Sequence, residues 1–248
     1  MYSLRSAFDP LTRWLKPRIQ MNRIEEWQKI FRKIDDEILI PYKFNRLIAE
    51  RYFDIIKPTI KDGGDPTFHN WCNDNYARSL LLTIRMLCDE NKESCSIRYV
   101  LGQIAEHANE IKKNDYISRH ESRWQDTVRN IWNNEIGSDQ ENLPRAIPLK
   151  HIEELRSLSA SIVGITHNHI AHKSRNETAT FTIEFDEAYR VIRRLISICH
   201  FYADLVGEIV PNDDLNVSFC YNWESIFYQP WLKHSRPVPS RVRKTRVT

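Results

Sequence analysis

Apolar residues recur along most of the chain at intervals of three and four, the spacing that places side chains on one face of an α-helix. The first stripe runs from about residue 23 to a stop before Pro41, and the second ends at Pro58. Further stripes cover residues 66–88, 97–111, 148–163 and 185–205. Strict alternation of apolar and polar positions is confined to residues 180–185. The pattern therefore predicts an all-α helical bundle.

The ends of several helices carry their own signals. Asp65 and Pro66 match an N-cap and a first helical position, and Gly207 matches a helix stop. A more polar stretch, 116–132, predicts a peripheral helix, and 135–147 predicts a loop. The anchors expected for the peripheral helix are Trp124, Val128, Ile131 and Trp132.

Charge is unevenly distributed along the 248 residues. The net charge is +3, but residues 235–248 carry five Lys and Arg and no acid, so residues 1–234 carry −2. We expect an N-terminal extension at 1–22, one helical domain at 23–234 and a disordered basic tail at 235–248. Six aromatic residues within 218–232 predict a cap over an apolar end of the bundle, with base stacking as the alternative.

The sequence lacks the motifs on which the common nucleotide-binding and hydrolase folds depend. It contains no G-x-G-x-x-G, G-x-x-x-x-G-K or G-x-S-x-G motif, and only 6 glycines. No uncharged apolar run approaches the roughly 18–20 residues of a membrane span, and the N-terminus does not resemble a secretory signal. The five cysteines are never spaced C-x-x-C. We expect a cytoplasmic protein with reduced cysteines and no membrane contact.

A histidine-rich segment, 166–175, is the strongest candidate for chemistry. Asn168, His169, His172 and Arg175 fall on one helical face, and three of the nine histidines lie within six residues. A neutral imidazole can take a proton from a ribose hydroxyl, and a guanidinium can stabilise charge on a phosphate. Zinc binding by H-x-H-x-x-H is one alternative. A purely structural role at a helix end is the other.

A second basic face is predicted on the helix at 66–88. Arg78 and Arg85 are two turns apart and lie on a common side. The alternative for Arg85 is an i, i+4 ion pair with Asp89 on the surface.

Three landmarks, in order, carry a resemblance to a known family. They are residues 71–97, the triplet Ile170-Ala171-His172, and residues 221–227 followed by Pro230-Trp231-Leu232. Over roughly residues 23–232 the chain resembles the abortive-infection U type of HEPN-like proteins. The resemblance implies a helical bundle that pairs as a homodimer and places two arginine-x4-6-histidine motifs across a shared cleft. It also implies metal-independent RNA cleavage by a toxin or phage-defence protein, with no cofactor and with an antitoxin or defence protein as partner.

The resemblance assigns roles to individual residues. His172 matches the motif histidine and Asn168 the polar residue of the motif, whereas the arginine would lie at Ile165, Thr166 or His167, of which only His167 is basic. The expected catalytic residues are thus His172 and Asn168, with His167 or Arg175 neutralising the phosphate. The expected RNA contacts are Lys173, His169, Arg85 and Arg78. The alternative is a catalytically inactive helical module for dimerisation or binding.

Overall fold

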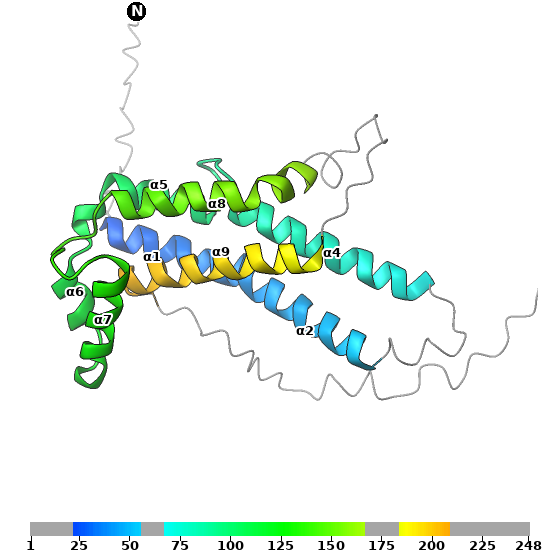
Figure 1. The fold of residues 1–248 in the computed structure, drawn as a ribbon, viewed down its shortest axis with the longest axis horizontal. Helices are drawn as coiled ribbons and strands as arrows, with labels where there is room; N and C mark the ends of the chain where they lie inside the picture. The colour runs from blue at the N-terminus through cyan, green and yellow to red at the C-terminus, as the bar shows by residue number, and fades with distance from the viewer. Residues whose placement is uncertain (1–21, 56–66, 167–183, 209–248) are drawn as a thin grey trace, which may run out of the picture.

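The computed structural model describes residues 22–55, 67–166 and 184–208, and these form a bundle of α-helices (Figure 1). The predicted all-α class is confirmed. Within the described ranges there is no strand, and Lys112 and Asn142 form one isolated β-bridge. The helical elements are α1 (Arg23–Ile34), η1 (Asp35–Leu39), α2 (Ile40–Ile55), α4 (Thr67–Leu87), α5 (Ile97–Glu106), η2 (Ala108–Glu110), α6 (Lys113–Ser118), η3 (Ser122–Trp124), α7 (Gln125–Glu135), α8 (Ala146–Ile165) and α9 (Phe185–Val206).

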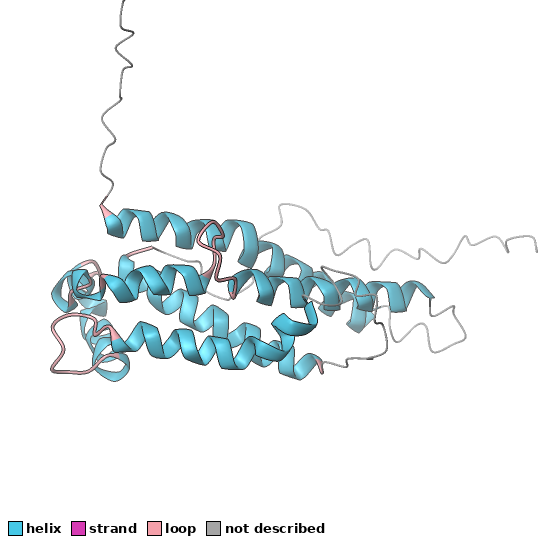
Figure 2. Cartoon of the chain, turned by 90° about the horizontal axis from the view of Figure 1, so that it is seen from above, coloured by secondary structure: helices cyan, strands magenta, loops and turns pink. Residues whose placement is uncertain are grey.

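The long helices lie side by side along the length of the molecule, and α6 and α7 gather at one end (Figures 1 and 2). Helix α5 packs on α8, α1 packs on α9, and α4 contacts α2, α8 and α9. The last helix is therefore in contact with the first, so the core is built from helices far apart in the sequence. No helix among the described residues combines the length and apolarity needed to cross a membrane.

The prediction that the first helix ends before Pro41 is wrong. Helix α1 passes without a break through a π-helical segment, Asp35–Leu39, into α2. The backbone N–H of Ile40 donates to the carbonyl of Asp35, five residues earlier. This wider turn precedes Pro41 and relieves the clash that a proline ring makes with a preceding α-helical turn.

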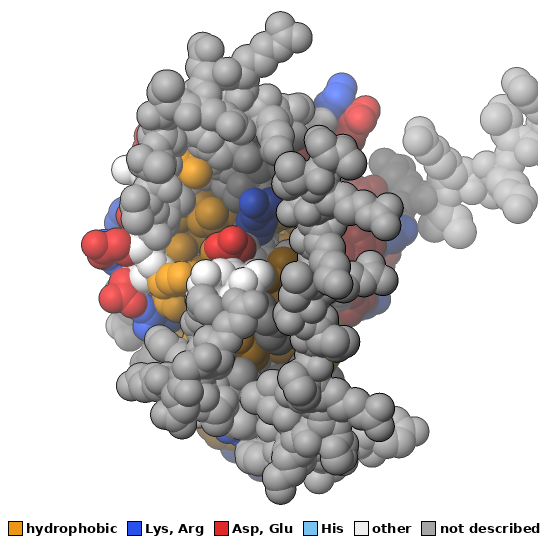
Figure 3. All heavy atoms as spheres, turned by 90° about the vertical axis from the view of Figure 1, so that its right-hand side faces the viewer, with side chains coloured by type: hydrophobic (Ala, Val, Ile, Leu, Met, Phe, Trp, Pro, Cys, Tyr) orange, Lys and Arg blue, Asp and Glu red, His pale blue; other side chains and the backbone are white. Residues whose placement is uncertain are grey.

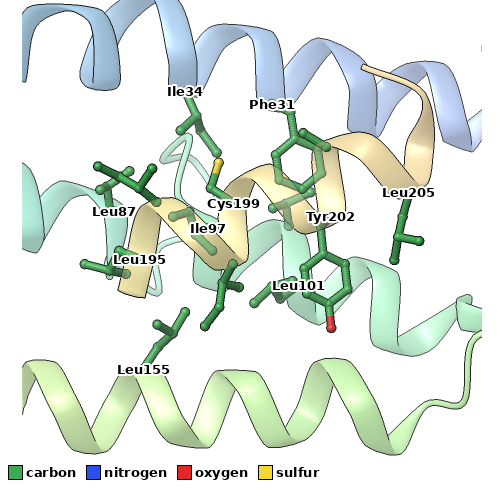
Figure 4. Packing of buried hydrophobic residues seen from close by; sticks show 14 of the residues in the cluster. Phe31, Ile34, Leu87, Ile97, Leu101, Leu155, Leu195, Cys199, Tyr202 and Leu205 are labelled. Carbon is green, nitrogen blue, oxygen red and sulfur yellow. The ribbon is translucent and has the colours of Figure 1, made fainter. Parts of the chain in front are cut away.

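The core follows the predicted apolar stripes closely. Figure 4 shows side chains from α1, α4, α5, α8 and α9 converging on one cluster. Fully buried members include Phe31, Leu101, Leu155, Cys199 and Tyr202. Burial raises the pKa of the Cys199 thiol, which therefore behaves as a small apolar side chain.

The predicted peripheral helix at 116–132 is divided into three pieces. Helix α6 ends at Ser118, a short 3-10 turn follows, and α7 begins at Gln125. The intervening residues 119–123 contain no apolar side chain that could hold a continuous helix against the core. Of the expected anchors, Val128 and Trp132 are buried, whereas Trp124 and Ile131 are exposed.

Apolar side chains reach the surface at the opposite end of the bundle. There Phe185 is 41% exposed, and its ring stacks on the buried ring of Tyr76 with centroids 6.1 Å apart; the Tyr76 hydroxyl lies 2.7 Å from that of Tyr189. Figure 3 faces this end and shows hydrophobic side chains of the described helices at the surface. The predicted aromatic cap at 218–232 and the basic tail at 235–248 lie outside the described residues, so both remain predictions, as do the domain boundaries.

A buried histidine gives the bundle a predicted dependence on pH. His151 lies 2.9 Å, through Nδ1, from the Tyr202 hydroxyl, and burial lowers the pKa of His151 below its usual 6.5. The unfolded chain therefore binds more protons below pH 6.5, so acid favours unfolding.

We expect the free energy of unfolding to fall, from about pH 6.5 downward, by up to about 1.4 kcal/mol for each pH unit. Urea denaturation at about pH 7.5 and at about pH 5.5 measures this loss. The variant His151→Gln, which retains a hydrogen-bonding group, should show a smaller difference between the two conditions. An equal loss in variant and wild type would contradict the assignment.

Candidate functional site

Two of the eight predicted site residues, Arg78 and Arg85, lie in the described part of the chain. The others lie outside the described residues: His167, Asn168, His169, His172, Lys173 and Arg175. Their predicted roles, and the zinc alternative, therefore remain predictions. In the described ranges no group of three or more His, Cys, Asp or Glu side chains could hold a metal ion.

Helix α8 leads directly into the histidine-rich segment. Gly164 is exposed near the end of this helix, and no described residue beyond its chain neighbours and its own helix backbone places a heavy atom within 4 Å of where a Cβ would stand. Thr166, by contrast, is buried, and its hydroxyl donates to the carbonyl of Ile162 at 2.7 Å. The side chain at position 166 thus faces the core rather than the surface.

Helix α4 positions the two predicted arginines. Because α4 is continuous from Thr67 to Leu87, Arg78 and Arg85 share one side and stand about 10 Å apart along it. The alternative ion pair between Arg85 and Asp89 is not formed. Oδ1 of Asp89 instead accepts the backbone N–H of Asn91 at 3.0 Å. Among the described residues, Arg85 makes no ion pair.

A surface pocket of about 440 Å³ lies between helices α4 and α8. Its lining comes from the end of α4, the turn that follows, the start of α5 and the end of α8. The lining residues are Arg85, Cys88, Asp89, Glu90, Arg98, Val163 and Gly164. The pocket thus brings Arg85 to the end of α8 from which the chain enters the histidine-rich segment.

Arg98 is a charged pocket residue that the sequence analysis missed. Its side chain is only 10% exposed, and its guanidinium pairs with the carboxylate of Glu90. Nη1 donates to the carbonyl of Cys88 at 3.4 Å, and Nε is buried without a hydrogen-bond partner. The sequence did contain a signal for this residue. Arg98 is the second residue of α5, a position where the helix dipole disfavours a cation.

Glu90 links Arg98 to a further arginine. Its Oε1 lies 3.7 Å from Nη2 of Arg156, and Arg156 also binds Glu153 at 2.8 Å. Cys88 contributes no charge, because burial raises the pKa of its thiol. The chemistry offered by the pocket is therefore the binding of an anion by guanidinium groups rather than nucleophilic attack by sulfur.

The comparisons with known proteins agree with the fold. The family model HEPN_AbiU2, described as AbiU2, matches residues 24–218. This match confirms the resemblance inferred from the sequence landmarks. No curated protein and no solved structure matches the chain significantly.

Proposed function

Because the chain belongs to the AbiU2 family, an abortive-infection family of HEPN proteins, we propose that it is a toxin or phage-defence protein that cleaves RNA without a metal ion. In this proposal His172 takes the proton of a ribose 2′-hydroxyl. The 2′-oxygen attacks the neighbouring phosphorus, the bond from phosphorus to the 5′-oxygen breaks, and that oxygen takes up a proton. The products are a 2′,3′-cyclic phosphate and a free 5′-hydroxyl, with no oxidant or water consumed.

The other residues of the segment bind the reacting phosphate. Asn168 orients it by hydrogen bonding, and His167 or Arg175 neutralises part of its charge. Lys173 and His169 contact the flanking RNA, as Arg78 does from helix α4. The motif residues thus bind the reacting phosphate, and the other cations bind the RNA strand on either side of the cleaved bond.

The position of Arg85 is the observation that carries the proposal. The chain has no arginine at the motif positions 165–167, so another cation must stabilise the charge that grows on the phosphate. Arg85 lines a pocket with Gly164, near the end of α8, and among the described residues it is not engaged by a carboxylate. It is thus available to an anionic substrate brought to this end of α8.

We expect purified wild-type protein to cleave single-stranded RNA in the presence of a chelator. His172→Ala should lower the rate by about 100-fold or more, the contribution usual for a general base. His107→Ala, which removes a partly exposed imidazole outside the pocket, is the matched control and should retain the wild-type rate. Gel electrophoresis with end-group analysis measures both the rate and the cyclic phosphate.

Equal cleavage by wild type and His172→Ala would remove His172 from catalysis. A folded wild-type protein that cuts no RNA would instead favour the second candidate, an inactive helical module for dimerisation or binding. The observation that favours this candidate is the missing motif arginine, with Thr166 buried at one of its three positions.

A further inference from the structure

The pocket between α4, α5 and α8 contains a charged side chain that the fold only partly satisfies. Arg98 is nine-tenths buried, yet its Nε has no hydrogen-bond partner among the described residues. We propose that this pocket binds the phosphate group of a nucleotide or of RNA through Arg85 and Arg98, and that Glu90 occupies the anion position in the free protein. This inference rests on the proposed function, because both use Arg85, but it is tested by binding rather than by cleavage.

The arrangement of charge favours an anion once Glu90 moves. Arg85 and Arg98 line the pocket, and Arg98 stands at the positive N-terminal end of the ten-residue helix α5. Of the two lining carboxylates, that of Asp89 accepts a hydrogen bond within its own turn. Glu90 is therefore the carboxylate that balances the guanidinium of Arg98.

Glu90 is placed where a bound phosphate could displace its carboxylate. Its side chain is 63% exposed and projects from the turn that joins α4 to α5. Its carboxylate meets Arg98 and Arg156, just as a phosphate oxygen would meet guanidinium groups. The Glu90 side of this pair is exposed, so an incoming phosphate can replace its carboxylate as the counter-charge of the buried Arg98 guanidinium. A displaced Glu90 leaves Arg85 and Arg98 facing the ligand together.

The pocket is large enough for a ligand bigger than a free phosphate ion. A volume of about 440 Å³ falls within the range of about 300–1,000 Å³ found for small-molecule sites. Among the described residues, no atom outside the helix's own backbone and the neighbouring residues lies within 4 Å of a Cβ added at Gly164, so no described side chain fills that position on the α8 side. A mononucleotide or one nucleotide unit of a strand can therefore enter with its phosphate toward Arg98. A mononucleotide and an RNA strand both carry a phosphate ester, and this is the group that the pocket would bind in either ligand.

Calorimetric titration of the full-length protein with inorganic phosphate, adenosine 5′-monophosphate and a short single-stranded RNA tests the inference. Glu90→Gln should tighten phosphate binding by about tenfold, because it removes the competing anion but keeps the side-chain volume. Arg85→Gln should weaken binding by about tenfold, because a charge-assisted hydrogen bond is lost. Arg129→Gln, an exposed arginine of α7 outside the pocket, is the control for loss of positive charge alone.

Binding of the monophosphate with these variant effects assigns the site to nucleotides, and binding of the RNA alone with the same effects assigns it to a strand. Either result supports the inference. It is overturned if Glu90→Gln leaves every affinity unchanged, or if Arg129→Gln weakens binding as much as Arg85→Gln does. RNA cleavage that depends on His172 without any effect of Glu90→Gln on binding would overturn this inference while leaving the proposed function intact.

Discussion

Replacing Trp132 with alanine is expected to lower the free energy of unfolding by about 3–5 kcal/mol, the range found for a buried aromatic side chain removed from a core. Trp132 of α7 is fully buried, and its ring lies 5.9 Å from that of Tyr116. Its Nε1 donates to the carbonyl of Gln140 at 2.9 Å. The substitution therefore creates a cavity and also leaves a carbonyl of the following loop without this donor. Urea denaturation followed by circular dichroism measures the loss.

Trp124→Ala is the matched control on the same side of the bundle. Trp124 is 52% exposed, and its ring meets the guanidinium of Arg123 at 5.6 Å. The expected loss is below about 1 kcal/mol, because an exposed ring gives up little buried area and one weak cation–π contact. A larger effect at Trp124 than at Trp132 would contradict the burial described for these two rings.

Replacing Gly207 with alanine is expected to cost about 1–2 kcal/mol of stability, because a Cβ disfavours the left-handed backbone conformation of this residue. Gly207 has φ of 81°, in the left-handed region, and its N–H donates to the carbonyl of Asp204 to close helix α9. An added Cβ would stand 2.6 Å from Nη1 of Arg119 and 3.1 Å from its Cδ. Arg119 would have to move away from the end of α9.

Gly102→Ala provides a control of opposite sign. Gly102 lies inside α5, and an added Cβ would meet no heavy atom within 4 Å. Alanine there should raise the free energy of unfolding by up to about 1 kcal/mol, since glycine costs that much inside a helix. Thermal unfolding of both variants gives the comparison. A loss of stability in Gly102→Ala, or none in Gly207→Ala, would contradict the helix boundaries described here.

The stability of the bundle bears on function because the pocket lies between packed helices. The pocket is lined by three helices and one turn, and α5 and α8 pack against each other along the bundle. Arg98 is kept buried by that packing. A variant that loosens the bundle would therefore weaken phosphate binding indirectly, whereas Glu90→Gln and Arg85→Gln act at the pocket itself.

The sequence by itself determined the class of fold, the family, most of the core and the end of the last helix. Apolar residues spaced three and four apart must share a face, and glycine is the residue that adopts φ above zero without strain, so both features can be recognised along one segment. The three landmarks of the family are equally local, since each is a short run of residues.

The tertiary structure alone decided the continuity of the helix at Pro41 and the composition of the pocket. At Pro41 a π-helical turn, packed within the bundle, overrides the local preference of proline to end a helix. The pocket forms only because α8 packs against α4 and α5. This packing places four residues in its lining: Arg85, Glu90, Arg98 and Gly164. The spacing of apolar residues shows which side of a helix faces the core. Which other helix packs against that side depends on how the whole chain folds.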